Sequence, residues 1–227
     1  RGIEFLSLRL LINNQGINSK NINKLSHTVS MKVGISTTSF QFNDLAEVKY
    51  SILANRALPF SAMAIVEITP LKDIEITANN YMSVPEELKE AKTEYKVLKD
   101  NKYQMPVFRT TAKTATGKYS VSASTTFLFD GLRETLLQTE KEVGFTKKLQ
   151  KGVSYRFAIA GGICTSKDVS DPINESERQP IYAQQEGIDN ILNKHKQAWN
   201  ELWTSGDIEI EGDLEAQQRV RFALYNL

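Results

Sequence analysis

Residues Tyr119 to Phe129, YSVSASTTFLF, decide the fold class of this chain. The odd-numbered side chains are mostly apolar or aromatic, and the side chains between them are mainly serine and threonine. A period of two over this length predicts a half-buried strand of an antiparallel sheet. Turn residues bound it, Thr116-Gly117 before it and Asp130-Gly131 after it.

The same period recurs from Ile3 to about Ile163. Two runs, Ser61 to Ile68 and Tyr155 to Ile163, are apolar on both parities, so we expect inner strands covered on both faces. Gly161 and Gly162 are expected to break or kink the end of the second run. Many strands at short spacing, with turns and no helices between them, predict a large sandwich of two antiparallel sheets.

One segment, Pro85 to Tyr103, leaves two structures open. The spacing of Leu88, Ala91 and Tyr95 suits a helix. Tyr95 and Val97 instead suit a strand followed by a hairpin turn at Asp100-Asn101. Its many glutamates and lysines predict a solvated excursion from the sheets in either case.

The pattern changes after the sandwich residues, 1–165. Residues 166–183 are polar and contain Pro172 and Pro180, which predicts a loop. An apolar stripe of period 3.6 from Gln184 to Trp203 then predicts a helix that ends at Gly206. We expect Asp207 to Gly212 to form a short strand and Asp213 to cap a second helix, so that 184–227 form a helical linker and a further helix cut short.

Composition excludes some functional classes. The chain has 227 residues with 28 basic and 27 acidic side chains, a net charge of +1, so no nucleic-acid partner is expected. Its one cysteine, Cys164, excludes an internal disulfide. No apolar run approaches the roughly 20 residues of a membrane span. The chain starts at Arg1 and stops inside a predicted helix, so we expect a piece of a longer protein.

Acidic residues alternate with isoleucines near the end of the chain. These acids are Asp207, Glu209, Glu211 and Asp213. On one face of a strand they offer ligands for a hard cation, or a carboxylate pair for glycoside hydrolysis. Because Asp and Glu are usually exposed, we favour a strand with Ile208 and Ile210 inward and the acids in water.

The remaining candidates lack the partners that chemistry needs. His27, His195 and Cys164 have no triad pattern around them, so a packed Cys164 and a hydrogen-bonded, buried His195 are favoured. The Gly161-Gly162 stretch lacks a phosphate-loop pattern. Trp199 and Trp203 lie four apart on the helical stripe and suit core packing. Tyr81 and Tyr103 remain as sugar-stacking candidates. We predict no catalytic, cofactor-binding or metal-binding residue and no cofactor.

Two stretches resemble glycoside hydrolase family 65. KQAWNELWTSGDIEIEGDLEAQQRVRFALYNL, Lys196 to Leu227, is similar to the entry to the family's catalytic barrel. NRALPFSAMAIVEITPLKDIEI, Asn55 to Ile76, resembles its amino-terminal sandwich. The resemblance implies a β-supersandwich that leads through a helical linker into an (α/α)6 barrel. It also implies a catalytic glutamate in that barrel, beyond Leu227.

The resemblance also implies partners and a reaction. The parent enzyme would cleave an α-glucosidic disaccharide, with inorganic phosphate as co-substrate if it is a phosphorylase and water if it is a hydrolase. This chain would support barrel packing, the active-site rim and a homodimer, without catalysis of its own. Some branches of the family are exported, which favours the periplasm. The alternative hypothesis is a carbohydrate-binding or structural sandwich module, although no tryptophan lies in residues 1–165.

Overall fold

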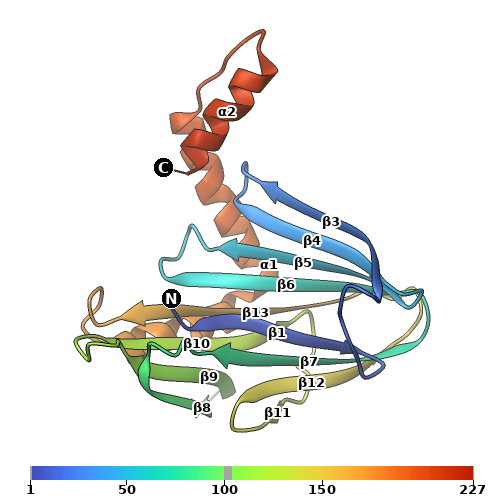
Figure 1. Cartoon of the computed structure of the whole chain (residues 1–227), viewed down its shortest axis with the longest axis vertical. Helices are drawn as coiled ribbons and strands as arrows, with labels where there is room; N and C mark the ends of the chain where they lie inside the picture. The colour runs from blue at the N-terminus through green and yellow to red at the C-terminus, as the bar shows by residue number, and fades with distance from the viewer. Residues whose placement is uncertain (1, 100–103, 227) are drawn as a thin grey trace.

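The computed structural model describes residues 2–99 and 104–226, whose strands form two antiparallel sheets followed by helices (Figure 1). One sheet has the order β11 (Leu137–Gln138), β12 (Glu142–Leu149), β7 (Ile74–Ser83), β1 (Glu4–Ile12), β2 (Gln15–Gly16). The second has the order β3 (Ile22–Ser30), β4 (Ile35–Phe42), β5 (Ala46–Ala54), β6 (Ser61–Pro70), β13 (Tyr155–Thr165), β10 (Ser120–Phe129), β9 (Gln104–Lys113), β8 (Lys89–Lys99). Helices α1 (Pro172–Gly206) and α2 (Leu214–Tyr225) follow.

The predicted mainly β sandwich is confirmed. Its core lies between the two sheets, where Phe42, Phe145 and Phe157 are fully buried. The rings of Phe145 and Phe157 meet edge to face, with centroids 5.1 Å apart and an interplanar angle of 88°. The inward residues of YSVSASTTFLF supply part of this core, so the period of two identified its inner face correctly.

The ambiguous segment contains a strand. β8 pairs with β9 antiparallel and places Tyr95 opposite Phe108, so the helical alternative is wrong. Its lysines and glutamates suit a strand at the edge of a sheet, where one side of the backbone is open to water. The turn expected at Asp100-Asn101 lies outside the described residues.

The loop predicted for residues 166–183 is present only at 166–171, and its remainder is wrong because α1 begins at Pro172. Asp171 caps it by accepting a hydrogen bond from the Asn174 amide at 3.0 Å. Proline is well suited to the first turn, where its missing N–H leaves no hydrogen bond unmade. Gly187, with φ of 76°, then kinks α1 into two helical segments.

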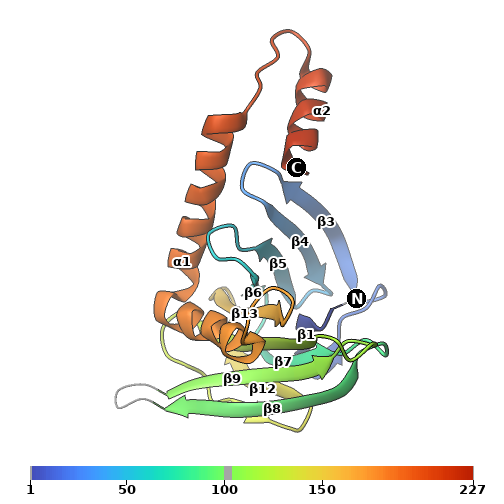
Figure 2. The same ribbon diagram turned by 90° about the vertical axis from the view of Figure 1, so that its left-hand side faces the viewer.

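Helix α1 covers the outer face of the eight-stranded sheet (Figure 2). The serines on that face of β10 are therefore buried under the helix. We expected this face to be solvated, but Ser122 and Ser124 are fully buried. Their hydroxyl oxygens lie 2.7 and 2.9 Å from that of Ser176 on α1, which donates to the Ile173 carbonyl. The three serine hydroxyl groups are therefore paired with one another although they are buried.

The two central glycines allow this close packing and do not interrupt β13, which continues to Thr165. A Cβ atom at Gly162 would lie 2.5 Å from Cγ of Gln179 on α1 and 2.8 Å from the Phe60 carbonyl oxygen. A Cβ atom at Gly161 would lie 2.0 Å from the Ser124 carbonyl oxygen. The break expected at Gly161-Gly162 is therefore wrong, and the glycines mark a close approach instead.

A buried ion-pair cluster also ties α1 to the sheet. Glu177 of α1 is nearly inaccessible and pairs with Arg109 of β9 and Lys96 of β8. Arg109 also pairs with Glu94. Removing one partner would leave a buried charge uncompensated, so the cluster fixes where α1 lies on the sheet.

We predict that Gly162→Ala lowers the free energy of unfolding by about 1–3 kcal/mol, because the added methyl group overpacks the interface with Gln179. Urea denaturation followed by circular dichroism measures it. Gly206→Ala is the matched control: a Cβ there meets nothing within 4 Å, and alanine favours a helix, so stability is kept or slightly raised. Equal effects of the two substitutions would contradict the packing role of Gly162.

Candidate functional site

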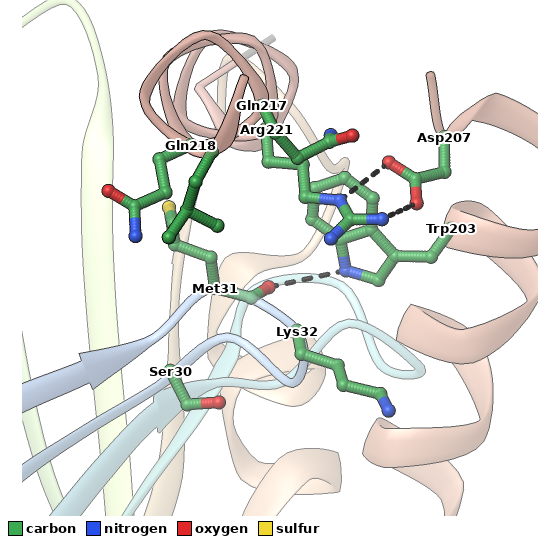
Figure 3. Close-up of a pocket in the computed structure, with 9 residues that line it drawn as sticks. Ser30, Met31, Lys32, Trp203, Asp207, Gln217, Gln218 and Arg221 are labelled. Atoms are coloured by element: carbon green, nitrogen blue, oxygen red, sulfur yellow. Dashed lines mark hydrogen bonds and ion pairs between the residues drawn. The ribbon is translucent and has the colours of Figure 1, made fainter. Parts of the chain in front are cut away.

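A pocket lies where the turn between β3 and β4 meets the end of α1 and the face of α2 (Figure 3). Its volume is about 520 Å³. The lining residues are Ser30, Met31, Lys32, Trp203, Asp207, Leu214, Gln217, Gln218 and Arg221. The indole N–H of Trp203 donates to the Met31 carbonyl at 3.3 Å, so the turn and the helix form one wall.

Asp207 is the only carboxylate among these lining residues, and it is paired with Arg221. Two hydrogen bonds join them, from Nε at 3.0 Å and from a terminal guanidinium nitrogen at 2.5 Å, as Figure 3 shows. The Arg221 hydrogen bond lowers the pKa of Asp207 below its usual value. Glycoside hydrolysis needs a second carboxyl group and a protonated acid. The pocket therefore lacks the groups for that reaction.

The acidic strand expected at Asp207 to Gly212 is not formed. Gln217 of α2 takes the place of a neighbouring strand: its Oε1 accepts from the Ile210 amide at 2.6 Å, and its Nε2 donates to the Ile208 carbonyl at 2.8 Å. Ile208 is 52% exposed, so its predicted inward position is wrong.

The four acids take separate roles. Asp207 pairs with Arg221, and Asp213 caps α2 by accepting from the Ala216 amide at 2.9 Å. Glu209 and Glu211 are exposed. Across residues 2–99 and 104–226, no group of three or more His, Cys, Asp and Glu side chains is placed to hold a metal ion.

His195 is completely buried and joins two loops that are distant in sequence. Its Nδ1 accepts from the Arg56 amide, after β5, at 3.0 Å. Its Nε2 lies 2.7 Å from the Val33 carbonyl, before β4, and donates to it. This arrangement needs a neutral ring with the proton on Nε2. Burial lowers the pKa of His195, so neutrality is favoured, as the packed interpretation expects.

The tryptophans also hold this junction together. The ring of Trp199 stacks between those of Trp203 and Tyr225, at centroid distances of 6.3 and 5.2 Å. The Arg56 guanidinium lies 5.6 Å from the centre of Trp199. Gly34 has φ of 57°, and a Cβ atom there would lie 2.4 Å from the indole. The rings therefore pack on one another and on the turn before β4, as the four-residue spacing of the tryptophans predicted.

The other sequence candidates are placed apart from this junction. Cys164 is buried on β13, and burial raises the pKa of its thiol to about 11, so it is a poor nucleophile near neutral pH. His27 is exposed on β3, with Nδ1 2.8 Å from the Thr38 hydroxyl. Tyr81 lies on β7 under the Arg9 guanidinium, 5.4 Å from the ring centre. Tyr103 lies outside the described residues.

Sequence patterns missed two polar residues that organise the pocket, Arg221 and Gln217. Both lie on α2, and each accepts or donates hydrogen bonds with a residue that precedes it by seven to fourteen positions along the chain. The only signal in the sequence was their helical spacing of four, which places both on one face of α2.

The environment of His195 predicts acid sensitivity. Because its folded pKa is lowered, the unfolded chain binds a proton below about pH 6.5 that the folded chain does not accept. The free energy of unfolding should therefore fall as pH decreases from about 6.5, and His195→Gln should remove part of that fall. Urea denaturation at several pH values measures it. Parallel profiles for His195→Gln and wild type would contradict the role of His195.

Comparison with known proteins matches this chain to one family model and to enzymes that are named for kojibiose. The model of "Glycosyl hydrolase family 65, N-terminal domain" matches residues 3–202. Kojibiose hydrolases from Flavobacterium johnsoniae and Mucilaginibacter mallensis are 38% and 32% identical over 98% of this chain. The chain spans 34% of the length of each. A kojibiose phosphorylase from Thermoanaerobacter brockii is 40% identical over 28% of the chain and 8% of its own length.

A solved structure has the same fold. It is a human-microbiome protein provisionally assigned as a kojibiose phosphorylase, and its TM-score is 0.78 at 14% identity. The match covers 99% of this chain and 31% of that chain. Of the helices in the described ranges, none has the length and apolar character to cross a membrane.

Proposed function

The chain belongs to glycoside hydrolase family 65, as its N-terminal domain, and on this premise we propose that it is the non-catalytic domain of an enzyme that cleaves an α-glucosidic disaccharide. The near-complete matches to two kojibiose hydrolases carry the proposal. They favour kojibiose as the substrate and water as the acceptor of the glucosyl group. The phosphorylase match covers a smaller part of the chain, so phosphate is the second choice of acceptor.

The side chains that could act as acids, bases or nucleophiles support a non-catalytic role, because each of them is already held in a structural contact. Arg221 holds Asp207 in its charged form, and two backbone groups hold His195 in its neutral form. Cys164 stays protonated near neutral pH. A catalytic acid needs a pKa near the working pH and a path to substrate, and none of these three groups offers both.

The shape of the domain indicates what it does instead. The helical arm, which consists of residues 188–206 of α1 together with α2, extends away from the sandwich (Figure 1). His195 and the tryptophans fix this arm to the turns at Val33 and Arg56. Leu214 and Phe222 of α2 are exposed. We propose that the arm carries the rest of the enzyme in a set position relative to the sandwich.

An assay of two proteins tests the function. The 227-residue chain and the full-length protein that contains it are each incubated with kojibiose, maltose and trehalose, with and without inorganic phosphate. We expect no product from the 227-residue chain. From the full-length protein we expect free glucose without a need for phosphate, with kojibiose the best substrate.

The possible failures are distinct. Glucose release by the 227-residue chain would contradict the non-catalytic role. Glucose phosphate that forms only when phosphate is present would replace hydrolysis with phosphorolysis. No cleavage of any of the three sugars by the full-length protein would contradict the proposed substrate class.

A further inference from the structure

Helix α1 is attached to the sandwich in two different ways. Residues 172–186 lie on the eight-stranded sheet, where Ser176 and Glu177 bind to side chains of β10 and β9. The arm begins beyond the kink, and its first residues include Ile188 and Ile191, which are buried in a small core cluster. The rest of the arm extends away from the sandwich (Figure 2). Its position therefore depends on contacts made by later residues.

Two loops of the sandwich make these contacts, the turn at 31–34 between β3 and β4 and the loop after β5. The indole N–H of Trp203 donates to a carbonyl of the turn, and Trp199 packs on the same turn and against the Arg56 guanidinium. His195 hydrogen-bonds to both loops. It is also completely buried, so it lies at the centre of the junction between the arm and the sandwich.

The geometry of this junction requires a neutral His195 ring. Nδ1 accepts the Arg56 N–H at 3.0 Å, and Nε2 donates to the Val33 carbonyl at 2.7 Å. Protonation places a hydrogen on Nδ1, and both ring nitrogens are then donors. An N–H of the ring would face the Arg56 N–H with no acceptor between them. Turning the ring over exchanges the nitrogens and leaves the same conflict. A protonated ring is therefore incompatible with the closed junction, because buried donors need acceptors.

The charges around the ring do not offset this conflict. Lys196 follows on the helix, Arg56 lies in the loop after β5 and Lys32 lies in the turn, and all three are cationic. Burial is the largest effect on the pKa of His195 and lowers it. The hydrogen bonds to the turn raise this pKa without outweighing burial, and Lys196 lowers it further. In the part of the chain that the structure describes, no carboxylate is among the groups that shift this pKa. An imidazolium ring is therefore stabilised only where it reaches water.

We propose that His195 is a pH-sensitive latch: the arm is fastened to both loops while the ring is neutral, and it is released from them when the ring gains a proton. Movement of the arm beyond Ile191 brings the ring into water. The main core between the sheets is built from residues between Leu6 and Ile159, before α1 begins, so it stays packed during this movement. The latch therefore opens the junction without unfolding the sandwich.

The size of the effect follows from two protonation equilibria. A histidine exposed by release has a pKa of about 6.5, whereas the pKa of the closed ring is lower. Below about pH 6.5 the released form therefore binds a proton that the closed form does not. Release then becomes easier by about tenfold for each pH unit, until the closed pKa is reached. From about pH 7.5 to about pH 5.0, the opening equilibrium should rise by up to about thirtyfold.

Native-state hydrogen exchange followed by NMR tests the latch on the 227-residue chain. The Arg56 amide is the reporter, since His195 is its acceptor. We expect its protection factor, corrected for the intrinsic effect of pH on exchange, to fall by up to about thirtyfold over this pH range. Low urea concentrations should hardly change it, because release exposes little surface. Amides of β13, such as that of Ile159, should be more protected and should lose protection as urea is added, because they exchange by global unfolding.

His195→Gln is the matched variant, because a glutamine amide also offers an acceptor and a donor but does not titrate. Its Arg56 amide should keep the same protection factor across the pH range, with circular dichroism to confirm the fold. A measurement on the wild type does not depend on this variant: ring nitrogen chemical shifts should show a neutral His195 with its proton on Nε2 at about pH 7.5. Three results would each overturn the proposal: equal pH dependence in variant and wild type, a protonated ring that leaves Arg56 protected, or Arg56 exchange with the protection and urea dependence of β13.

Discussion

The absence of a side chain at Gly162 lets α1 lie directly on the centre of the eight-stranded sheet, and the rest of the domain depends on that contact. The helix buries an outer sheet face that would otherwise be solvated. It brings Ser176 to the serines of β10 and Glu177 to Arg109. Buried polar groups of this kind add specificity because they are satisfied in only one placement of the helix. Gly162 therefore sets the distance of α1 from the sheet, and the polar contacts set its position along the strands.

The same helix then carries the arm. Beyond the kink at Gly187, His195 bonds to backbone groups of two separate turns, and Trp199 packs against Gly34 in one of them. These contacts make the arm part of the sandwich domain. A rigid arm is what a non-catalytic domain needs if it is to position another part of its enzyme. The likeness of the chain to about a third of each kojibiose hydrolase is consistent with this role.

The sequence predicted the sandwich because alternation of side chains reports directly on one buried face. Alternation did not predict burial where the covering element is distant in the chain. The sequence pattern predicts that Ser122 and Ser124 are solvated, and they are buried only because Ser176 of α1 packs against them. Pro172 and Pro180 suggested a loop, although Pro172 stands at the first helical position, where proline is compatible with a helix, and Pro180 lies inside α1. Composition alone does not distinguish these cases.

The sequence also predicted only part of the candidate site. The spacing of Trp199 and Trp203 correctly indicated packing, and the position of His195 on an apolar stripe correctly indicated a buried ring. The segment from Asp207 to Gly212 alternates like a strand but has Gln217 as its hydrogen-bond partner. A side chain that replaces a neighbouring strand leaves no periodic signal. The family resemblance supplied what periodicity lacked, namely the relation of this chain to a larger enzyme.

Truncation shows whether α1 is an integral part of the sandwich domain. Residues 1–170 lack both helices, whereas residues 1–206 lack only α2 and the segment before it. Urea unfolding of the two fragments should differ: 1–206 should unfold cooperatively, and 1–170 should show no cooperative transition because the outer face of its sheet is uncovered. Cooperative unfolding of 1–170, with the same free energy of unfolding as 1–206, would mean that α1 is dispensable for the folding of the sandwich.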